Sequence, residues 1–270
     1  MRKSSLVAIQ VCLLGALFAS AAARAQDSPP RAWTLRSGGV VYRLALSDEQ
    51  LKLEYFGPSG DGETAGRDSN SSPPRDDFSG LAEGSSLAPE SLRLVAQETR
   101  SLPKGVNTVR LTLRHKELPL DVEALYAAWG ETGVLSRELK LINRGATSLR
   151  VSSLPSLVWD LPSGEYTLRY LWGGWGQERQ MTAERLGAGT RSFIQSKGRS
   201  TNHYVPWLSL RDEDRNLEYL AELAWSGNWS MDVEKLPGRG QSALRDQRVR
   251  ATMGMRHDFG DALALAPGET

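Results

Sequence analysis

The chain has 270 residues, with 33 basic and 32 acidic side chains and a formal net charge of +1. This balance leaves no strongly basic face, which argues against a nucleic-acid partner. The single cysteine, Cys12, excludes a disulfide framework, and the rest of the chain has no thiol to serve as a metal ligand or nucleophile.

The first 25 residues have the pattern of a secretory signal peptide. Two basic residues precede an apolar run over residues 6–23, which ends in an A-x-A cleavage sequence. We expect cleavage after Ala25, export to the periplasm or the extracellular space, and no membrane attachment afterwards. A transmembrane anchor and a lipoprotein anchor at Cys12 are the alternatives. The run is short for a spanning helix, and Cys12 lies in the middle of it.

Beyond the signal, apolar and polar residues alternate with the period of β-strands. Turn sequences separate the runs, for example Asn-Arg-Gly at 143–145 and Pro-Ser-Gly at 162–164. Many short strands at regular spacing are typical of a β-sandwich. We therefore predict an all-β fold with few or no helices. In chain order, the alternating segments are Val40–Leu46, Leu51–Tyr55, Val109–Leu113, Leu135–Ile142, Tyr166–Leu171, Leu217–Ala224 and Val249–Met255.

Two segments depart from this rhythm. Gly57–Glu90 is rich in Gly, Ser, Pro and Asp, and we expect a long, exposed and partly flexible loop there. A phosphate-binding loop within it is excluded, because the lysine and the hydroxyl residue of that motif are missing. Leu118–Trp129 fits either a short helix or a strand, and Pro119 favours the edge of a strand.

The side chains that could perform chemistry are scattered along the chain. His115, His203 and His257 have no neighbours at metal-ligand spacing, so we expect neither a metal nor a cofactor. Glycoside hydrolysis uses two carboxylates that flank the scissile bond. The acidic pairs of this chain stand in polar turn sequences, where we expect them to be solvated. Asp160 and Glu178 stand near tryptophans and are better placed for a sugar.

Several sequence blocks occur in an order that resembles one known domain. The blocks are Tyr55-Phe56-Gly57, Leu139–Gly145, Trp172–Arg179, Ser196–His203, Trp225–Trp229 and a final Pro267-Gly268-Glu269. Together they resemble the N-terminal β-domain of glycoside hydrolase family 36, the α-galactosidases. The resemblance runs from about Val40 to Thr270 and implies a single domain over residues 26–270. It implies a β-supersandwich, in which two large antiparallel sheets pack face to face.

The same resemblance implies a catalytic (β/α)8 barrel downstream, which carries both catalytic aspartates of the family. No motif of that barrel occurs in this sequence, so the resemblance assigns no catalytic residue to this chain. We therefore expect the chain alone to be inactive. The resemblance implies a non-catalytic domain that packs on the catalytic barrel of an exported enzyme, and that this enzyme hydrolyses terminal α-galactosides. We expect this chain to be truncated before that barrel. Assembly into a homo-oligomer is compatible with the resemblance. The alternatives are a free-standing secreted carbohydrate-binding module and a structural partner of a separate barrel subunit.

In relatives, a loop of the β-domain reaches over the active site and contacts the sugar. By position, Phe56, Asp61 and Arg67 are the candidates for this galactoside contact. The glycine-rich insert that holds two of them departs from the length typical of the family.

A second group of candidates lies in the later blocks. Trp172 and Trp175, with Glu178, fit a sugar-facing platform, and core packing is the alternative for the two aromatic rings. Arg199 and His203 either contact the sugar or hold a turn in place through internal hydrogen bonds.

Overall fold

A computed structural model describes residues 5–11, 32–60, 75–76, 78–199, 201–236, 248–256 and 262–270, with residues 5–11 and 75–76 described by their backbone. Within these ranges the protein is a β-sandwich built from three sheets. The helical elements of the described residues are two single 3₁₀ turns, η1 (Pro89–Ser91) and η2 (Pro103–Gly105). The all-β prediction is therefore confirmed. No helix in the described ranges is long and apolar enough to span a bilayer.

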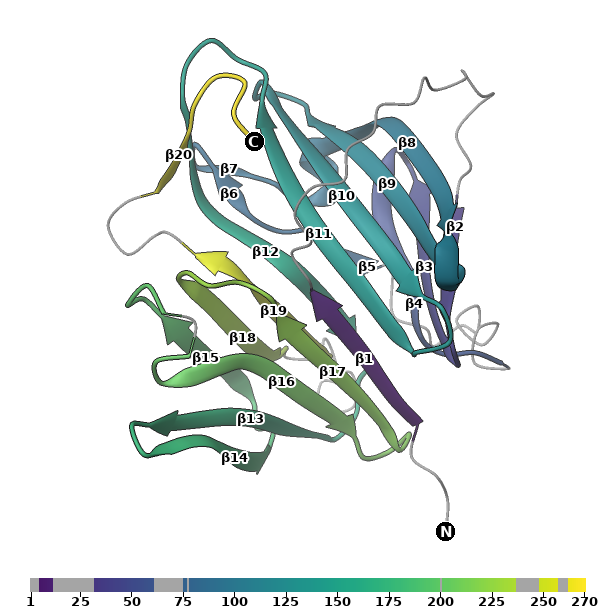
Figure 1. The fold of residues 1–270 in the computed structure, drawn as a ribbon, viewed down its shortest axis with the longest axis vertical. Coiled ribbons are helices and arrows are strands. Elements are labelled where there is room, and N and C mark those ends of the chain that lie inside the picture. The colour runs from purple at the N-terminus through teal and green to yellow at the C-terminus, as the bar shows by residue number, and fades with distance from the viewer. Residues whose placement is uncertain are drawn as a thin grey trace, which may run out of the picture.

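One layer of the sandwich is a nine-stranded sheet (Figure 1). Its strands are antiparallel to their neighbours, except that β1 runs parallel to both β11 and β17. In spatial order they are β14 (Gln177–Arg185), β13 (Tyr166–Gly174), β16 (Tyr204–Asp212), β17 (Leu217–Leu223), β1 (Ser5–Val11), β11 (Val134–Asn143), β10 (Leu120–Trp129), β9 (Val106–His115) and β8 (Leu92–Leu102).

Two smaller sheets share the opposite layer. The four-stranded sheet packs on the β8–β10 side, where the Tyr42 and Tyr126 rings lie 5.8 Å apart. The seven-stranded sheet packs on the β13–β17 side, where the Tyr170 and Phe193 rings lie 4.6 Å apart. The first sheet contains β2 (Ala32–Ser37), β3 (Val40–Ser47), β4 (Gln50–Pro58) and β5 (Arg75–Asp76). The second contains β15 (Gly189–Gln195), β18 (Trp229–Lys235), β19 (Val249–Arg256), β12 (Leu149–Leu161), β6 (Leu81–Ala82), β7 (Ser85–Ser86) and β20 (Leu263–Leu265).

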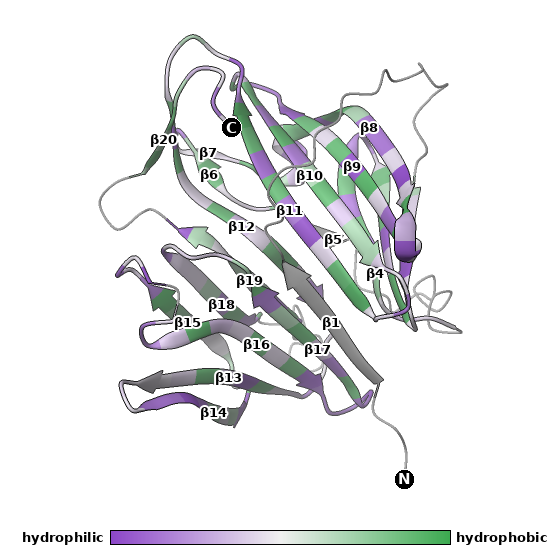
Figure 2. Ribbon diagram, in the orientation of Figure 1, coloured by the Kyte–Doolittle hydropathy of each residue, from purple (hydrophilic) through white to green (hydrophobic). Residues whose placement is uncertain are grey.

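Alternation along the strands produces the core. In β18, Trp229, Met231 and Val233 are fully buried, while the residues between them are partly exposed. Successive side chains of a strand point to opposite faces of the sheet, so one face faces the core and the other faces solvent. Figure 2 shows the same alternation of hydrophobic and hydrophilic residues along β9, β10 and β11. Each predicted alternating segment is a strand, and the ambiguous Leu118–Trp129 segment forms β10 rather than a helix.

Part of the segment expected to be a loop is structured. Residues 78–91 contain β6, β7 and η1, and β6 pairs with β12. The anchors are apolar side chains that the polar composition of the segment conceals, because Phe78 and Leu87 are both buried in the core. Residues 61–74 and 77 lie outside the described part of the chain.

The turn after β11 holds the C-terminal segment in place. The Asn143 side-chain amide donates a hydrogen bond of 2.9 Å to the Leu265 carbonyl. The Gly268 N–H donates to the Asn143 carbonyl over 3.0 Å. Two blocks of the sequence resemblance, the Asn-Arg-Gly turn and the final Pro-Gly-Glu, are therefore in contact.

A buried carboxylate strengthens the same region. Asp121 on β10 accepts hydrogen bonds of 2.8 and 3.1 Å from Arg114 and one of 3.0 Å from Arg144. Hydrogen bonding from Arg114, reinforced by Arg144, holds the pKa of Asp121 below its ordinary value of 3.8. A carboxylate whose pKa is lowered by folding stabilises the native state above its ordinary pKa. That contribution is lost as the pH falls through the folded-state value.

We expect Asp121→Asn to lower the free energy of unfolding at neutral pH by about 1–3 kcal/mol, because the neutral amide replaces charge-assisted hydrogen bonds. The deficit should shrink as the pH falls below about 4, where the wild-type carboxylate also becomes protonated. Urea unfolding midpoints across this pH range measure both effects. Glu98→Gln, in the exposed pair with Arg100, is the control and should cost less than about 1 kcal/mol. A deficit for Asp121→Asn that does not change with pH would contradict the electrostatic origin.

Candidate functional site

Five of the predicted sugar-contact residues lie on, or at the strand ends beside, two connections between strands β13 and β16. Residues 172–178 span the end of β13, the β13–β14 turn and the start of β14, and residues 196–199 and 201–203 belong to the β15–β16 connection. A third connection, residues 224–228 between β17 and β18, adjoins them. We call these three segments the loop end. Figure 1 shows the β13–β14 turn at the left edge of the molecule.

Backbone and side-chain hydrogen bonds join the three segments. The Gly173 N–H donates to the His203 carbonyl over 2.9 Å, which ties the β13–β14 turn to the next connection. The Gly198 N–H donates to the Asn228 side-chain oxygen over 2.7 Å. The Trp225 indole N–H in turn donates to the Asn228 carbonyl over 3.1 Å. These bonds make the loop end one connected surface.

The β13–β14 turn presents two tryptophans. A Cβ atom at Gly173 would lie 2.1 Å from the Gln177 carbonyl oxygen, so only glycine lets the two strands close here. Trp172 is 42% exposed, and its indole N–H donates to the Thr182 hydroxyl over 2.8 Å. Trp175, at the tip, is 100% exposed. The core-packing alternative therefore does not describe Trp175, because its ring makes no buried contact.

The charged candidates of the loop end are exposed as well. Glu178 on β14 and Arg199 in the next connection both face solvent. His203 is exposed, with its ring packed edge-on against Tyr204 at 5.5 Å. The bond that ties the His203 loop to the β13–β14 turn uses the backbone carbonyl of His203 rather than its imidazole.

Sequence reasoning missed two residues that organise this surface. Thr182 orients the Trp172 ring, and Asn228 joins two of the connections. Asn228 carried a local signal, because asparagine beside glycine in a short connection commonly bonds to nearby backbone. Thr182 carried none, since its contact depends on strand pairing across the turn.

The first group of candidates is not part of the loop end. Phe56 is 3% exposed, and its ring stacks on Trp159 at 5.4 Å inside the core. A ring buried in this way offers no surface to a sugar, so the expected sugar contact does not fit the position of Phe56. Asp61 and Arg67 lie outside the described residues.

The carboxylates with buried or shifted environments do not form a catalytic pair. Asp160 is buried and accepts hydrogen bonds of 2.7 and 2.9 Å from Arg250. Hydrogen bonding from Thr167 lowers the pKa of Glu213. Burial raises the pKa of Glu138, but this residue lies on β11 and not on the loop end. None of these arrangements resembles the two opposed carboxylates of a glycosidase.

Of the three histidines, the structure describes His115 and His203, and His257 lies outside the described residues. The Nδ1 atom of His115 accepts N–H groups from Glu117 and Leu118 at 3.1 and 2.9 Å, and its Nε2 atom lies 3.1 Å from the Ser86 carbonyl. This buried ring holds the start of β10. In the part of the chain that the structure describes, no cluster of three or more His, Cys, Asp or Glu side chains could hold a metal ion.

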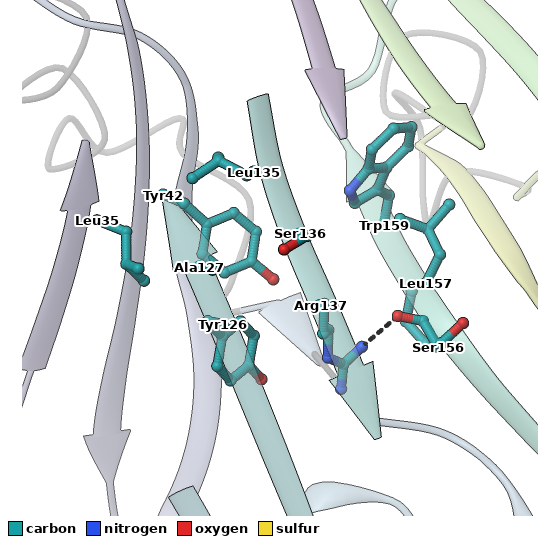
Figure 3. A pocket seen from close by; sticks show the side chains of 11 residues that line it. Leu35, Tyr42, Tyr126, Ala127, Leu135, Ser136, Arg137, Ser156, Leu157 and Trp159 are labelled. Atoms are coloured by element: carbon teal, nitrogen blue, oxygen red, sulfur yellow. Dashed lines mark hydrogen bonds between the residues drawn. The ribbon is translucent and has the colours of Figure 1, made fainter. Parts of the chain in front are cut away.

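A small cavity lies between the layers (Figure 3). Its water-accessible space is about 10 Å³, roughly one water molecule, which is far too small for a sugar ring. Arg137 enters it, donates to the Ser156 carbonyl over 3.0 Å, and lies 4.6 Å from the centre of the Phe78 ring. The cavity is therefore a detail of the core and not a ligand site.

Comparison with known sequences agrees with the resemblance in the sequence blocks. Residues 78–258 match the glycosyl hydrolase family 36 N-terminal domain. The chain is similar to α-galactosidase Mel36A of Lactobacillus acidophilus, with 28% identity over 133 residues, which are 47% of this chain and 18% of that protein. It is also similar to the bifunctional α-galactosidase/sucrose kinase AgaSK of Mediterraneibacter gnavus, with 26% identity over 173 residues, which are 62% and 17% of the two chains. The chain thus spans less than a fifth of the length of these two relatives.

Solved structures share the architecture. The α-galactosidase AgaA of Geobacillus stearothermophilus matches with a TM-score of 0.70 and 20% identity, over 88% of this chain and 39% of that one. The galactosidase domain of AgaSK matches with a TM-score of 0.69 and 19% identity, with the same two coverages. At this level of sequence identity, the similarity to these structures shows a shared fold.

Proposed function

The chain belongs to the family of glycosyl hydrolase family 36 N-terminal domains, and we propose that it is the non-catalytic domain of an exported α-galactosidase-like enzyme. In this proposal it packs on a catalytic barrel that hydrolyses terminal α-galactosides and supports that barrel. The chain covers only a small part of relatives that are named α-galactosidases, and the catalytic step is assigned to the part of such proteins that it does not cover. Export rests on the signal-peptide pattern of the first 25 residues.

The loop end is proposed as the surface that meets the barrel and its substrate. The observation that carries this proposal is Trp175, a large apolar ring that is 100% exposed at the tip of a braced turn. Aromatic rings with one apolar face and a polar edge are favoured where a surface meets a partner. Glu178, Arg199 and His203 stand on the same loop end and would supply hydrogen bonds to sugar hydroxyls.

The same surface supports a second candidate function, a secreted carbohydrate-binding module. Trp175 and the partly exposed Trp172 would then bind a galactoside without a barrel. Titration calorimetry with galactose, melibiose and raffinose distinguishes the two. Saturable heat with the isolated chain supports the binding module, whereas no heat supports a domain that acts only with its barrel. A separately encoded barrel subunit, the third arrangement, would co-purify from the source organism.

The decisive experiment measures the intact mass and the α-galactosidase activity of the native protein in its source. A mass that includes a barrel, together with turnover of an α-galactoside, supports the proposed function. A mass near that of the processed chain, with no co-purifying barrel, would overturn it. Turnover by the purified chain alone, above the level of contamination, would contradict the non-catalytic role.

We expect Trp175→Ala to leave stability unchanged within about 0.5 kcal/mol, because the ring is fully exposed. The variant should weaken galactoside binding or turnover in the barrel-containing enzyme by about tenfold, which corresponds to about 1.4 kcal/mol. Met181→Ala is the matched control. Met181 is also exposed, but the strand register places it on the face of β14 opposite to Trp172. Equal losses of galactoside binding or turnover in Trp175→Ala and Met181→Ala would argue against a specific role of Trp175.

A further inference from the structure

Residues 5–11, which include the start of the N-terminal apolar run, form the central strand of the nine-stranded sheet. β1 lies between β11 and β17 (Figure 1). Its backbone pairs with β17 from Ser5–Leu217 to Val11–Leu223. It pairs with β11 at Ala8–Val134 and Ile9–Leu135. Residues that resemble an export signal therefore form a strand of the fold in this structure.

This strand joins two halves of the sheet. On one side, β14, β13, β16 and β17 form an antiparallel set, and on the other β11, β10, β9 and β8 form a second. Within the described residues, β1 is the strand that connects them. Its removal would leave the facing edges of β11 and β17 unpaired in the middle of a layer, and unpaired strand edges are costly or bind another strand.

We call the space between β11 and β17, which β1 fills, the slot. The slot lies directly over the core. Tyr219 and Ala221 of β17 are buried, at 3% and 1% exposure, beside the pairs that β1 makes. The Tyr219 ring also packs on Phe56 and Trp159 of the opposite layer, at 5.6 and 6.1 Å. Opening the slot would bring water close to this aromatic cluster. In the uncleaved chain, β1 therefore closes the sheet beside this cluster.

We propose that the slot between β11 and β17 is a strand-docking site, and that residues 5–11 are its occupant in the uncleaved chain. Folding and export then compete for the same residues. A signal segment held in the centre of a sheet is withheld from the export machinery, and cleavage after Ala25 removes the strand. The competition rests on the proposed export, whereas occupancy of the slot does not.

Cross-linking tests the occupancy in the full chain. In a Cys12→Ser background, Ala8→Cys and Leu220→Cys are combined, since these residues are register partners on neighbouring strands. Neighbouring strands lie about 4.8 Å apart, within the Cα separation that a disulfide requires. We expect oxidation to link the two positions at least about tenfold faster than in the control that combines Ala8→Cys with Thr167→Cys on β13. Equal linking rates in the two proteins would overturn the proposal.

Hydrogen exchange on the unmodified full chain provides a second readout that does not depend on variants. The amides of residues 5–11 and 217–223 are expected to be protected together. Exchange of residues 5–11 at the rate of an unfolded peptide would overturn the occupancy, whatever the outcome for export or for the barrel.

The same cysteine pair tests the competition. Signal peptidase is offered the oxidised protein, in which the segment is locked in the slot, and the reduced protein, in which it can leave. We expect the locked protein to be cleaved at least about tenfold more slowly. Equal cleavage rates for the oxidised and reduced proteins would overturn the proposal that folding and export compete. Occupancy of the slot would then be decided by the cross-linking result alone. Failure of the α-galactosidase proposal would change neither outcome.

Discussion

Gly254→Ala is expected to destabilise the fold by about 3 kcal/mol, because the added methyl group would overlap backbone atoms of the neighbouring strand. A Cβ atom at Gly254 on β19 would lie 2.4 Å from the Pro155 Cα, 2.5 Å from the Leu154 carbonyl oxygen and 2.7 Å from the Ser156 nitrogen. All three are backbone atoms of β12, at the bulge between Pro155 and Leu157. No side-chain rotation can relieve this contact, so the two strands must separate.

The midpoint of urea unfolding measures the loss. Gly187→Ala is the control, because a Cβ atom at Gly187 would meet nothing within 4 Å, and we expect a change within about 0.5 kcal/mol. If Gly254→Ala unfolded at the wild-type midpoint, the close approach of β19 to the β12 bulge would be incorrect. The bulge itself would then need a different register.

Phe56→Ala is expected to cost about 3–5 kcal/mol, the range for removing a buried aromatic ring. The ring stacks on Trp159 at 5.4 Å and also meets Tyr42 and Tyr219 at 5.7 and 5.6 Å. These partners come from the four-stranded, seven-stranded and nine-stranded sheets. Removing the ring therefore leaves a cavity where all three sheets meet.

Thermal and urea unfolding of Phe56→Ala, beside Phe56→Leu and Trp175→Ala, separates packing from surface effects. Phe56→Leu retains much of the apolar volume and should recover part of the loss. Trp175→Ala removes a larger ring from the surface and should cost little. A stable Phe56→Ala protein with weakened galactoside binding would restore the sugar contact that the sequence suggested for this position.

Phe56 and Trp175 illustrate the limit of reading a site from sequence blocks. Both belong to aromatic-glycine stretches, and both were candidates for a sugar contact. One is 3% exposed and the other 100% exposed. The difference arises because Phe56 lies on β4 beneath strands that come 100 and more residues later, whereas Trp175 lies beyond the last paired residues of a hairpin.

The long Gly57–Glu90 segment shows the same limit for the fold. Its composition predicted a loop throughout, yet residues 78–91 form β6, β7 and η1. Isolated apolar residues such as Phe78 and Leu87 do not produce a periodic pattern. They become buried only because β12 and the sheets around it provide a surface for them.

The sequence by itself determined the all-β class, the positions of the main strands and the family. Alternation with a period of two is a property of a few neighbouring residues, and the family is read from blocks that keep their order along the chain. Only the tertiary structure decided that three sheets rather than two build the sandwich, that β1 joins the halves of the largest sheet, and that Trp175 is exposed while Phe56 is buried. These features depend on contacts between residues far apart in the chain, and local alternation does not specify which strands become neighbours or which face of a strand another sheet will cover.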